Sequence, residues 1–233
     1  MTITGTFVYA HAPNYRGRPM VHADTAEWRA ALEDLTYLGI DTVILQAALW
    51  RELNECYYPS GVFRSMKYFP VVDSLLEAAE QLNLKVFLGG YGSTTGWQEQ
   101  LSCAEVDREN DSQTICFKEL LTHYRGRFSG FYFAPETAFS GERQTDKEKK
   151  LNELYRRFCG TIREMAPELK ILMSPGTHYI PGQTPEMVAA WHEILRGVPL
   201  DIMAPQDSIG CCGNTLEHQQ ETFSAWRTIC DSY

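Results

Sequence analysis

The sequence predicts an α/β fold of the TIM-type (β/α) barrel class, in one domain over residues 1–233. Short apolar segments that read as strands alternate with helical segments along the whole chain. Strict alternation with near-continuous apolar strands indicates a parallel sheet covered by helices. No linker or change of composition divides the chain. Six β/α units are recognisable, whereas a full barrel has eight, so we expect a barrel that is shortened or incomplete.

Each unit rests on a strand and a helix with their own signals. The predicted strands are residues 3–10, 42–46, 85–90, 128–134, 170–174 and 201–204, and the predicted helices are residues 24–38, 71–82, 101–125, 145–165, 184–196 and 214–229. Asp24 can cap the first helix, apolar residues recur in it at helical spacing, and Gly39 ends it. Pro185 stands in the first turn of the fifth helix, where proline is favoured.

A doubly wound sheet would show the same alternation, and two features favour the barrel over it. The glycine-rich phosphate turn expected after the first strand of a dinucleotide-binding fold is missing, since residues 9–14 read Tyr-Ala-His-Ala-Pro-Asn. Polar residues also end several strands rather than gathering at one crevice. A full barrel has typically about 250 residues, so the last two strands are either lost or supplied in another way.

Charge and cysteine content limit the function classes. The formal net charge of -9 argues against a nucleic-acid or anionic-membrane partner, because both require a basic surface. No apolar run is long enough for a transmembrane helix, and the first residues lack the pattern of a signal peptide. We therefore expect a cytoplasmic protein, unless a leader has been removed. The seven cysteines show no CxxC spacing, which favours free thiols in a reducing compartment.

Polar side chains follow the second, fourth and sixth predicted strands, at the end where barrel enzymes do chemistry. These residues are Gln46, Glu136, Gln206 and Asp207. Side chains alternate along a strand, so Glu136 shares a face with Tyr132. If these faces look into the barrel, Gln46, Glu136 and Asp207 converge at its mouth.

Two carboxylates across a sugar-sized cleft are the apparatus of glycoside hydrolysis. Aromatic neighbours that desolvate Glu136 would raise its pKa, as a general acid requires. A structural role is open for each carboxylate. Glu136 could be a rim residue paired with Arg143, and Asp207 could be a turn or N-cap residue before the last helix.

Aromatic residues crowd the loops after the predicted strands, and sugars present C–H faces that pack on such rings. This set is Tyr9, Trp50, Tyr57, Tyr58, Tyr91, Trp97 and Tyr179. With the polar residues near them, the predicted substrate-binding residues are Tyr9, Gln46, Trp50, Tyr58, Tyr91, Tyr132, His178 and Gln206. No HxH or HExxH spacing supports a metal site, and neither a GxGxxG loop nor a GxSxG elbow is present, so no metal or cofactor is predicted.

Several segments together resemble DUF4434, a bacterial family grouped with TIM-barrel glycoside hydrolases. They are GIDTVILQ at residues 39–46, Tyr-Pro-Ser at 58–60, KVFLG at 85–89, Gly-Phe-Tyr at 130–132 leading to Glu136, and PQDSIG at 205–210. The resemblance covers nearly the whole chain. It implies a (β/α) barrel and a glycosidase with Glu136, after the fourth strand, as the acid/base. In such enzymes the nucleophile often follows the seventh strand, which leaves Asp207 to fill that role here.

The leading hypothesis is a glycoside hydrolase that acts on an oligo- or polysaccharide. Glu136 would protonate the leaving oxygen, and Asp207 would activate water or act as the nucleophile. The alternative is a non-catalytic carbohydrate-binding barrel, which would keep the aromatic surface and lose the second carboxylate. A metal-assisted hydrolase is a third class. The sugar, the linkage, the stereochemical outcome and the oligomeric state stay open.

Overall fold

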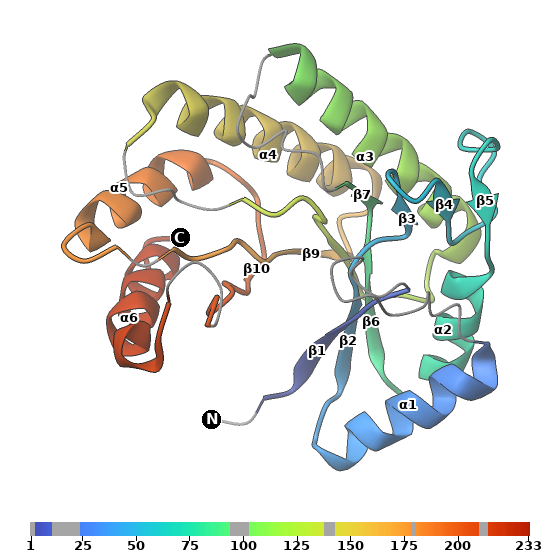
Figure 1. Ribbon diagram of the computed structural model, residues 1–233. Helices are drawn as coiled ribbons and strands as arrows, with labels where there is room; N and C mark the ends of the chain where they lie inside the picture. The colour runs from blue at the N-terminus through green and yellow to red at the C-terminus, as the bar shows by residue number, and fades with distance from the viewer. Residues whose placement is uncertain (1–2, 11–23, 94–102, 138–142, 179, 210–213) are drawn as a thin grey trace. The chain divides into compact units, whose positions relative to one another are not determined.

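Parallel strands and the helices between them build the protein, as the computed structural model shows for residues 3–10, 24–93, 103–137, 143–178, 180–209 and 214–233 (Figure 1). Contacts within the chain group it into two units, which are described in turn. The first comprises residues 1–95 with 112–135, and the second comprises residues 96–111 with 136–233.

Four parallel strands form the main sheet of the first unit. Their order is β1 (Gly5–Val8), β2 (Thr42–Leu45), β6 (Lys85–Gly89) and β8 (Gly130–Tyr132). Helices α1 (Thr25–Tyr37) and α2 (Val71–Gln81) pack side by side (Figure 1). Helix α3 (Cys103–Tyr124) precedes β8. These elements confirm the first four predicted strands and the first three predicted helices, with shorter strands than predicted.

The start of α1 follows the predicted cap. The backbone N–H of Glu27 donates to Asp24 Oδ1 over 2.9 Å, and the N–H of Asp24 donates to Glu27 Oε2 over 2.9 Å. This capping box satisfies two amide groups that the helix leaves without intrahelical partners. Trp28 and Leu32 are the buried residues of the helix. Gly39, with a φ of +84°, ends it.

The two faces of the main sheet carry different aromatic contacts. Phe7 pairs with Ile44, and Ile44 pairs with Phe87, so these three side chains share one face, called here the inner face. The ring of Tyr132 meets that of Phe7 edge to face at 5.1 Å. Tyr132 is only 1% exposed, and full burial of a side chain of this size contributes about 2–3 kcal/mol.

Phe131 points from β8 to the opposite, helix-covered face. Its ring meets that of Phe117 of α3 edge to face at 4.4 Å, and both side chains are fully buried. The alternation of Phe131 and Tyr132 explains why this aromatic strand reads as continuously apolar, because both of its faces are packed.

A second, small sheet follows β2 and was not predicted. Its strands are β3 (Leu49–Trp50), β4 (Glu55–Cys56), β5 (Lys67–Tyr68) and β7 (Tyr91–Gly92), in the order β5-β4-β3-β7. Strands β3 and β4 pair antiparallel, whereas β3 pairs parallel with β7. Each strand has two residues, too few for an alternating pattern to be visible in the sequence.

The second unit contains β9 (Lys170–Met173) and β10 (Ile202–Met203), which pair in parallel. Its helices are the long α4 (Thr145–Met165), α5 (Thr184–Leu195) and α6 (Gln219–Cys230). Helix α5 packs against both α4 and α6 (Figure 1). The last helix begins later than predicted, because a short 3-10 turn (Leu216–His218) precedes it.

Ionic and polar contacts tie the starts of the strands of the second unit together. The Asp201 carboxylate accepts the backbone N–H of Ile171 over 2.8 Å and forms ion pairs with Arg163 and with Lys170. Partial burial alone would raise the pKa of Asp201, but these donors hold it below its ordinary value. Asp201, the residue directly before β10, is thereby bound to the first residues of β9.

Four cysteines have free thiols among the described side chains: Cys56, Cys116, Cys159 and Cys230. Burial raises the pKa of Cys56 to about 11 and that of Cys159 to about 12, which keeps both thiols protonated near neutral pH. Cys211 and Cys212 lie outside the described residues. Within the described part of the chain, none of the helices has the length and hydropathy needed to cross a membrane.

Glu119 of α3 holds the loop that joins β4 to β5. Its carboxylate accepts hydrogen bonds from the Tyr58 hydroxyl (2.9 Å), the Ser60 hydroxyl (2.6 Å) and the backbone N–H groups of Gly61 (2.7 Å) and Val62 (3.1 Å). Partial burial would raise the pKa of Glu119, but the four donors lower it below its ordinary value. Its contribution to stability is therefore full above the ordinary pKa and is lost as the pH falls through the lowered pKa of the folded state.

We predict that Glu119→Gln lowers the free energy of unfolding at pH 7 by about 1–2 kcal/mol, a value reduced for solvent screening of this partly exposed group. Urea denaturation at pH 7 and at pH 3 measures the free energy of unfolding. The difference in this free energy between wild type and Glu119→Gln should be smaller at pH 3. The exposed Glu217 is the control, since Glu217→Gln should leave stability unchanged. A difference for Glu119→Gln that is the same at both pH values would contradict this assignment.

A close approach of β6 to β2 requires glycine at position 89. A Cβ atom there would lie 2.0 Å from the carbonyl oxygen of Gln46 and 2.6 Å from that of Leu45. Both atoms belong to the backbone and cannot swing aside. Gly160 of α4 is the opposite case, because a Cβ atom there would meet nothing within 4 Å.

Substitution by alanine should change the free energy of unfolding in opposite directions at Gly89 and Gly160. We expect Gly89→Ala to destabilise the protein by about 3 kcal/mol, because overpacking forces the backbone of β2 to move. Gly160→Ala should stabilise it by about 0.5–1 kcal/mol, since alanine lowers the conformational entropy lost in a helix. Thermal denaturation of both variants measures these changes, and the assignment fails if Gly89→Ala unfolds like wild type.

Candidate active site at the carboxyl ends of the strands

In the first unit, Gln46 extends β2 at its carboxyl end. Its backbone N–H donates to the carbonyl of Val8 over 3.0 Å, which continues the pairing of β1 with β2. Gln46 lies two residues beyond Ile44, so its side chain is on the same side as the inner face. Gly89 and Tyr132, which pair with each other, are on that side too. The half-buried side chain of Gln46 thus stands beside a glycine that carries no side chain.

Gln113 of α3 fixes the segment that follows β6. Its side-chain amide receives the backbone N–H of Tyr91 over 3.0 Å and donates to the Tyr91 carbonyl over 2.6 Å. Gln113 is fully buried, and a Cβ atom at Gly90 would lie 2.2 Å from its Oε1 atom. This buried glutamine was not predicted to matter, because nothing in the pattern of α3 distinguishes it from a surface residue.

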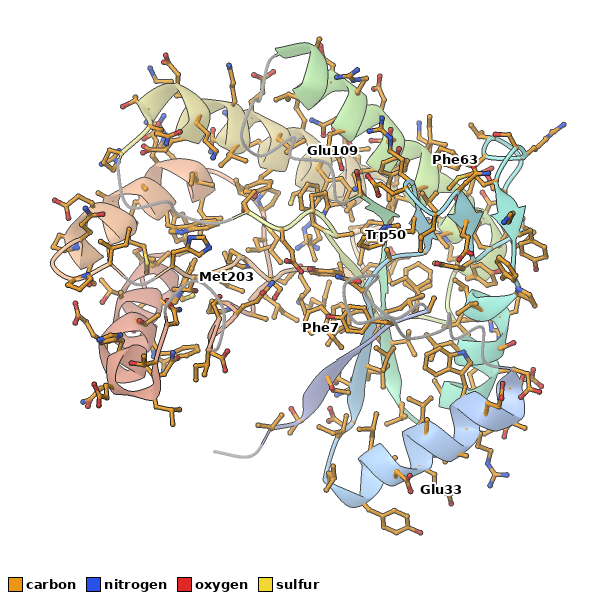
Figure 2. The ribbon with its side chains drawn as sticks, in the orientation of Figure 1. Phe7, Glu33, Trp50, Phe63, Glu109 and Met203 are labelled. Carbon is orange, nitrogen blue, oxygen red and sulfur yellow. The ribbon has the colours of Figure 1, made fainter. Side chains whose placement is uncertain are left out.

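The half-buried rings of Trp50 and Tyr91 come from strands β3 and β7 of the small sheet, whereas the sequence pattern places them in loops. Trp50 covers Gly92, where a Cβ atom would lie 2.6 Å from the indole ring. Tyr91 lies against Phe63, with ring centroids 6.0 Å apart; Figure 2 labels Trp50 and Phe63. Tyr9, the residue after β1 and Val8, is 42% exposed.

Two predicted substrate-binding residues are core residues. Tyr58 is fully buried, and its hydroxyl donates to Glu119. Tyr58 follows the unpredicted strand β4, and its part in substrate binding stays a prediction. Tyr132 lies on the inner face, where its ring is buried against Phe7, and its part in substrate binding stays a prediction.

In the second unit, Glu136 lies four residues beyond β8, and its side chain is exposed. The aromatic strand therefore does not provide the desolvation that we expected. The next residue, Thr137, is buried; its hydroxyl lies 2.5 Å from that of Tyr155, and its carbonyl accepts the N–H of Gly176 over 2.7 Å. Arg143, considered above as a partner, makes a two-point ion pair with Glu148 over 2.8 and 2.7 Å.

Asp207 is exposed and lies four residues beyond β10. Its Oδ1 atom accepts the backbone N–H of Ile209 over 3.0 Å, which confirms the predicted turn role. It is not the N-cap of the last helix, which begins at Gln219. A turn role for one carboxylate oxygen is compatible with a second role for the carboxylate.

Polar groups join the loops after β9 and β10. The backbone N–H of Gln206 donates to the carbonyl of Pro175 over 2.9 Å, and its side-chain amide donates to that of Ser174 over 3.1 Å. The buried Asn214 donates to the carbonyls of Thr177 and Asp207 over 2.7 and 2.8 Å. Asn214 was not predicted, since a single asparagine at the predicted start of the last helix carries no signal of its own.

The remaining predicted residues divide into two groups. His178 is half-buried in the loop after β9, next to Thr177. Trp97 and Tyr179 lie outside the described residues. Among the residues that the structure does describe, His, Cys, Asp and Glu side chains form no group of three or more that could hold a metal ion.

Solved structures with this fold include proteins named for sugar hydrolysis. A "putative alpha-L-fucosidase" from Bacteroides thetaiotaomicron VPI-5482 superposes with a TM-score of 0.79 at 21% identity, over 100% of this chain and 73% of that one. TsXylA, an intracellular xylanase from Thermoanaerobacterium saccharolyticum, gives 0.56 at 14% identity, over 98% of this chain and 70% of its own. The exo-beta-1,4-mannosidase Op5Man5 from Opitutaceae bacterium strain TAV5 gives 0.50 at 12% identity, over 99% and 49%.

These likenesses confirm the predicted fold class. The chain has an α/β fold of the TIM-barrel type. The β/α units of the described residues contain six parallel strands, whereas a full barrel has eight, so the described barrel is incomplete. No curated protein sequence matches it. Residues 3–232 match the family described as Domain of unknown function (DUF4434), and the chain belongs to that family.

Proposed function

We propose that this protein is a glycoside hydrolase that acts on an oligo- or polysaccharide through Glu136 and Asp207. The observation that carries the proposal is the placement of Glu136. It is an exposed carboxylate beyond the carboxyl end of β8, the fourth strand of the β/α units, on a segment anchored at Thr137. The carboxyl ends of strands are where barrel enzymes place their reacting groups.

Asp207 supplies the second carboxylate of the proposed pair. It follows β10 as Glu136 follows β8, and it is exposed to solvent. In the proposed reaction Glu136 protonates the glycosidic oxygen as the bond to the anomeric carbon breaks. Asp207 then either adds to that carbon or removes a proton from the attacking water. Both options need an exposed carboxylate on a loop that stays in place during the reaction.

The proposed sugar contacts come from residues with exposed surface. In the second unit, which also carries Glu136 and Asp207, His178 and Gln206 offer hydrogen-bonding groups. In the first unit, Tyr9, Trp50 and Tyr91 offer ring faces and Gln46 offers an amide, and their part in sugar binding is a separate proposal. Fold likeness to a fucosidase-like protein, a xylanase and a mannosidase supports a carbohydrate ligand. These three proteins carry names for different sugars, so the fold does not select one sugar.

A non-catalytic carbohydrate-binding protein is the second candidate. The observation that favours it is the hydrogen bond from Ile209 to Asp207, because a carboxylate that shapes its own turn has a structural reason to be present. In that case the Asp207 carboxylate would serve the turn alone, and a sugar would bind without being cleaved.

Amide substitutions at the two carboxylates separate these candidates. We expect Glu136→Gln and Asp207→Asn each to lower kcat by about 10²–10⁴-fold on any glycoside that wild type cleaves, because each removes a group that transfers a proton or forms a bond. Release of reducing ends from a panel of oligosaccharides measures the rate. Isothermal titration with the same sugars measures binding, which Glu136→Gln should retain.

Glu164→Gln is the matched control, because Glu164 is an exposed carboxylate on α4 of the same unit. It should keep wild-type activity. Sugar binding by wild type with no cleavage of any bound sugar would favour the binding protein, and equal activity in wild type and Glu136→Gln would refute the proposed acid.

A further inference from the structure

A single buried asparagine joins the two loops at the carboxyl ends of β9 and β10. Asn214 is 4% exposed, and its side-chain amide donates to the carbonyl of Thr177 over 2.7 Å and to that of Asp207 over 2.8 Å. The two acceptors lie 30 residues apart in sequence, one on each loop. A carbonyl that is withdrawn from water without a donor is unfavourable, so this one side chain stabilises both loops.

The partner on the β9 loop is itself fixed. Thr177 is 1% exposed, and its hydroxyl accepts the indole N–H of Trp226 of α6 over 2.9 Å. Its backbone N–H donates to the hydroxyl of Ser208 over 3.2 Å. The loop after β9 therefore forms a rigid support to which the loop after β10 is bound.

The conformation of the β10 loop determines where the Asp207 carboxylate lies. Ser208 has a φ of +53°, in the left-handed region that serine rarely adopts. This turn brings the N–H of Ile209 to Asp207 Oδ1, and residues 209 and 214 pair as an isolated bridge. An unfavourable backbone conformation persists only where surrounding contacts hold it, and the hydrogen bond from Asn214 to the Asp207 carbonyl is such a contact.

We infer that Asn214 is a positioning residue for Asp207, an inference that rests on the proposed glycoside hydrolase function. It holds the backbone on which the reacting carboxylate is carried, and it does so through the Asp207 carbonyl without touching the carboxylate. The carboxylate of Asp207 keeps a fixed direction because the turn at Ser208 is locked between Asn214 and Thr177. Without the Asn214 amide, the turn at Ser208 becomes mobile, and the Asp207 carboxylate no longer points in one direction.

Asn152 gives a control with the same local chemistry. Asn152 of α4 is 8% exposed, and its amide also donates to two carbonyls, those of Ile194 (2.9 Å) and Arg196 (2.8 Å). These acceptors lie at the end of α5, before β10 begins, and not in the loops that carry the proposed site. Removal of either amide takes away two hydrogen bonds to backbone carbonyls, so Asn214→Ala and Asn152→Ala should lower the melting temperature by similar amounts.

The first measurement needs no substrate. Hydrogen exchange resolved to residue 209 reports the hydrogen bond between Ile209 and the Asp207 carboxylate. We expect this exchange to become at least about tenfold faster in Asn214→Ala and to stay within about twofold of wild type in Asn152→Ala. Protection of Ile209 that is unchanged in Asn214→Ala, or lost equally in both variants, overturns the inference.

The second measurement uses a glycoside that wild type cleaves. Asn214→Ala should lower kcat about tenfold or more with KM within about threefold, whereas Asn152→Ala should keep both values. Unchanged kcat in Asn214→Ala overturns the catalytic part of the inference. If wild type cleaves no glycoside, the proposed function fails, and the exchange of Ile209 still decides whether Asn214 fixes the turn.

A milder variant covers the case in which Asn214→Ala does not fold. Gln219 is the second donor to the Asp207 carbonyl, over 3.3 Å, at the start of α6. Gln219→Ala keeps Asn214 in place, and it should raise the exchange of Ile209 by less than Asn214→Ala would, about two- to fivefold. No increase in Gln219→Ala, with Asn214→Ala unfolded, counts against control of the turn through this carbonyl.

Discussion

Backbone groups beyond the ends of short parallel strands must find hydrogen-bond partners, and buried side-chain amides supply them in this protein. Strand β6 ends at Gly89 and β10 ends at Met203, so the ladder of strand hydrogen bonds stops there. Gln113 then pairs with both backbone groups of Tyr91 in the first unit, and Asn214 pairs with two carbonyls in the second. Because a buried unpaired carbonyl or N–H group costs on the order of 1–3 kcal/mol, these amides determine the loop conformations.

This constraint gives the proposed active site its physical basis. The exposed carboxylates of Glu136 and Asp207 stand on segments whose neighbours are buried and hydrogen-bonded, at Thr137 and Asn214. A carboxylate that must meet a sugar at a fixed angle benefits from such a support, because misplacement by about 1 Å costs roughly 100-fold in rate. The loops are therefore suited to catalysis as well as to binding.

The fold could be predicted from the sequence wherever an element has a strong local signal. Asp24 caps α1 and Gly39 ends it as predicted, and the six parallel strands occur where apolar runs indicate them. The small sheet could not be predicted, because pairs of two-residue strands leave no periodic pattern. Tyr58, which follows one of these strands, therefore looked like an exposed loop residue and is a core residue.

The candidate site could be predicted only in part. Strand ends identified Glu136, Asp207 and Gln46, since a polar residue after an apolar run is a visible signal. The supporting residues Gln113 and Asn214 have no such signal, because their role depends on carbonyls that are distant in sequence. Their importance is a property of the folded chain, and a family likeness at 21% identity shows the fold without showing which amides hold it.

Glu136 and Asp207 are proposed to act as a pair, and the distance between their carboxyl groups is the most direct test of that pairing. A crystal structure of the protein with a bound oligosaccharide would measure that distance. We expect the two carboxyl groups to lie about 5–9.5 Å apart on either side of one glycosidic bond, with the shorter end of this range for retention and the longer end for inversion. Carboxyl groups well beyond that separation, or a sugar bound away from both residues, would refute the proposed pair.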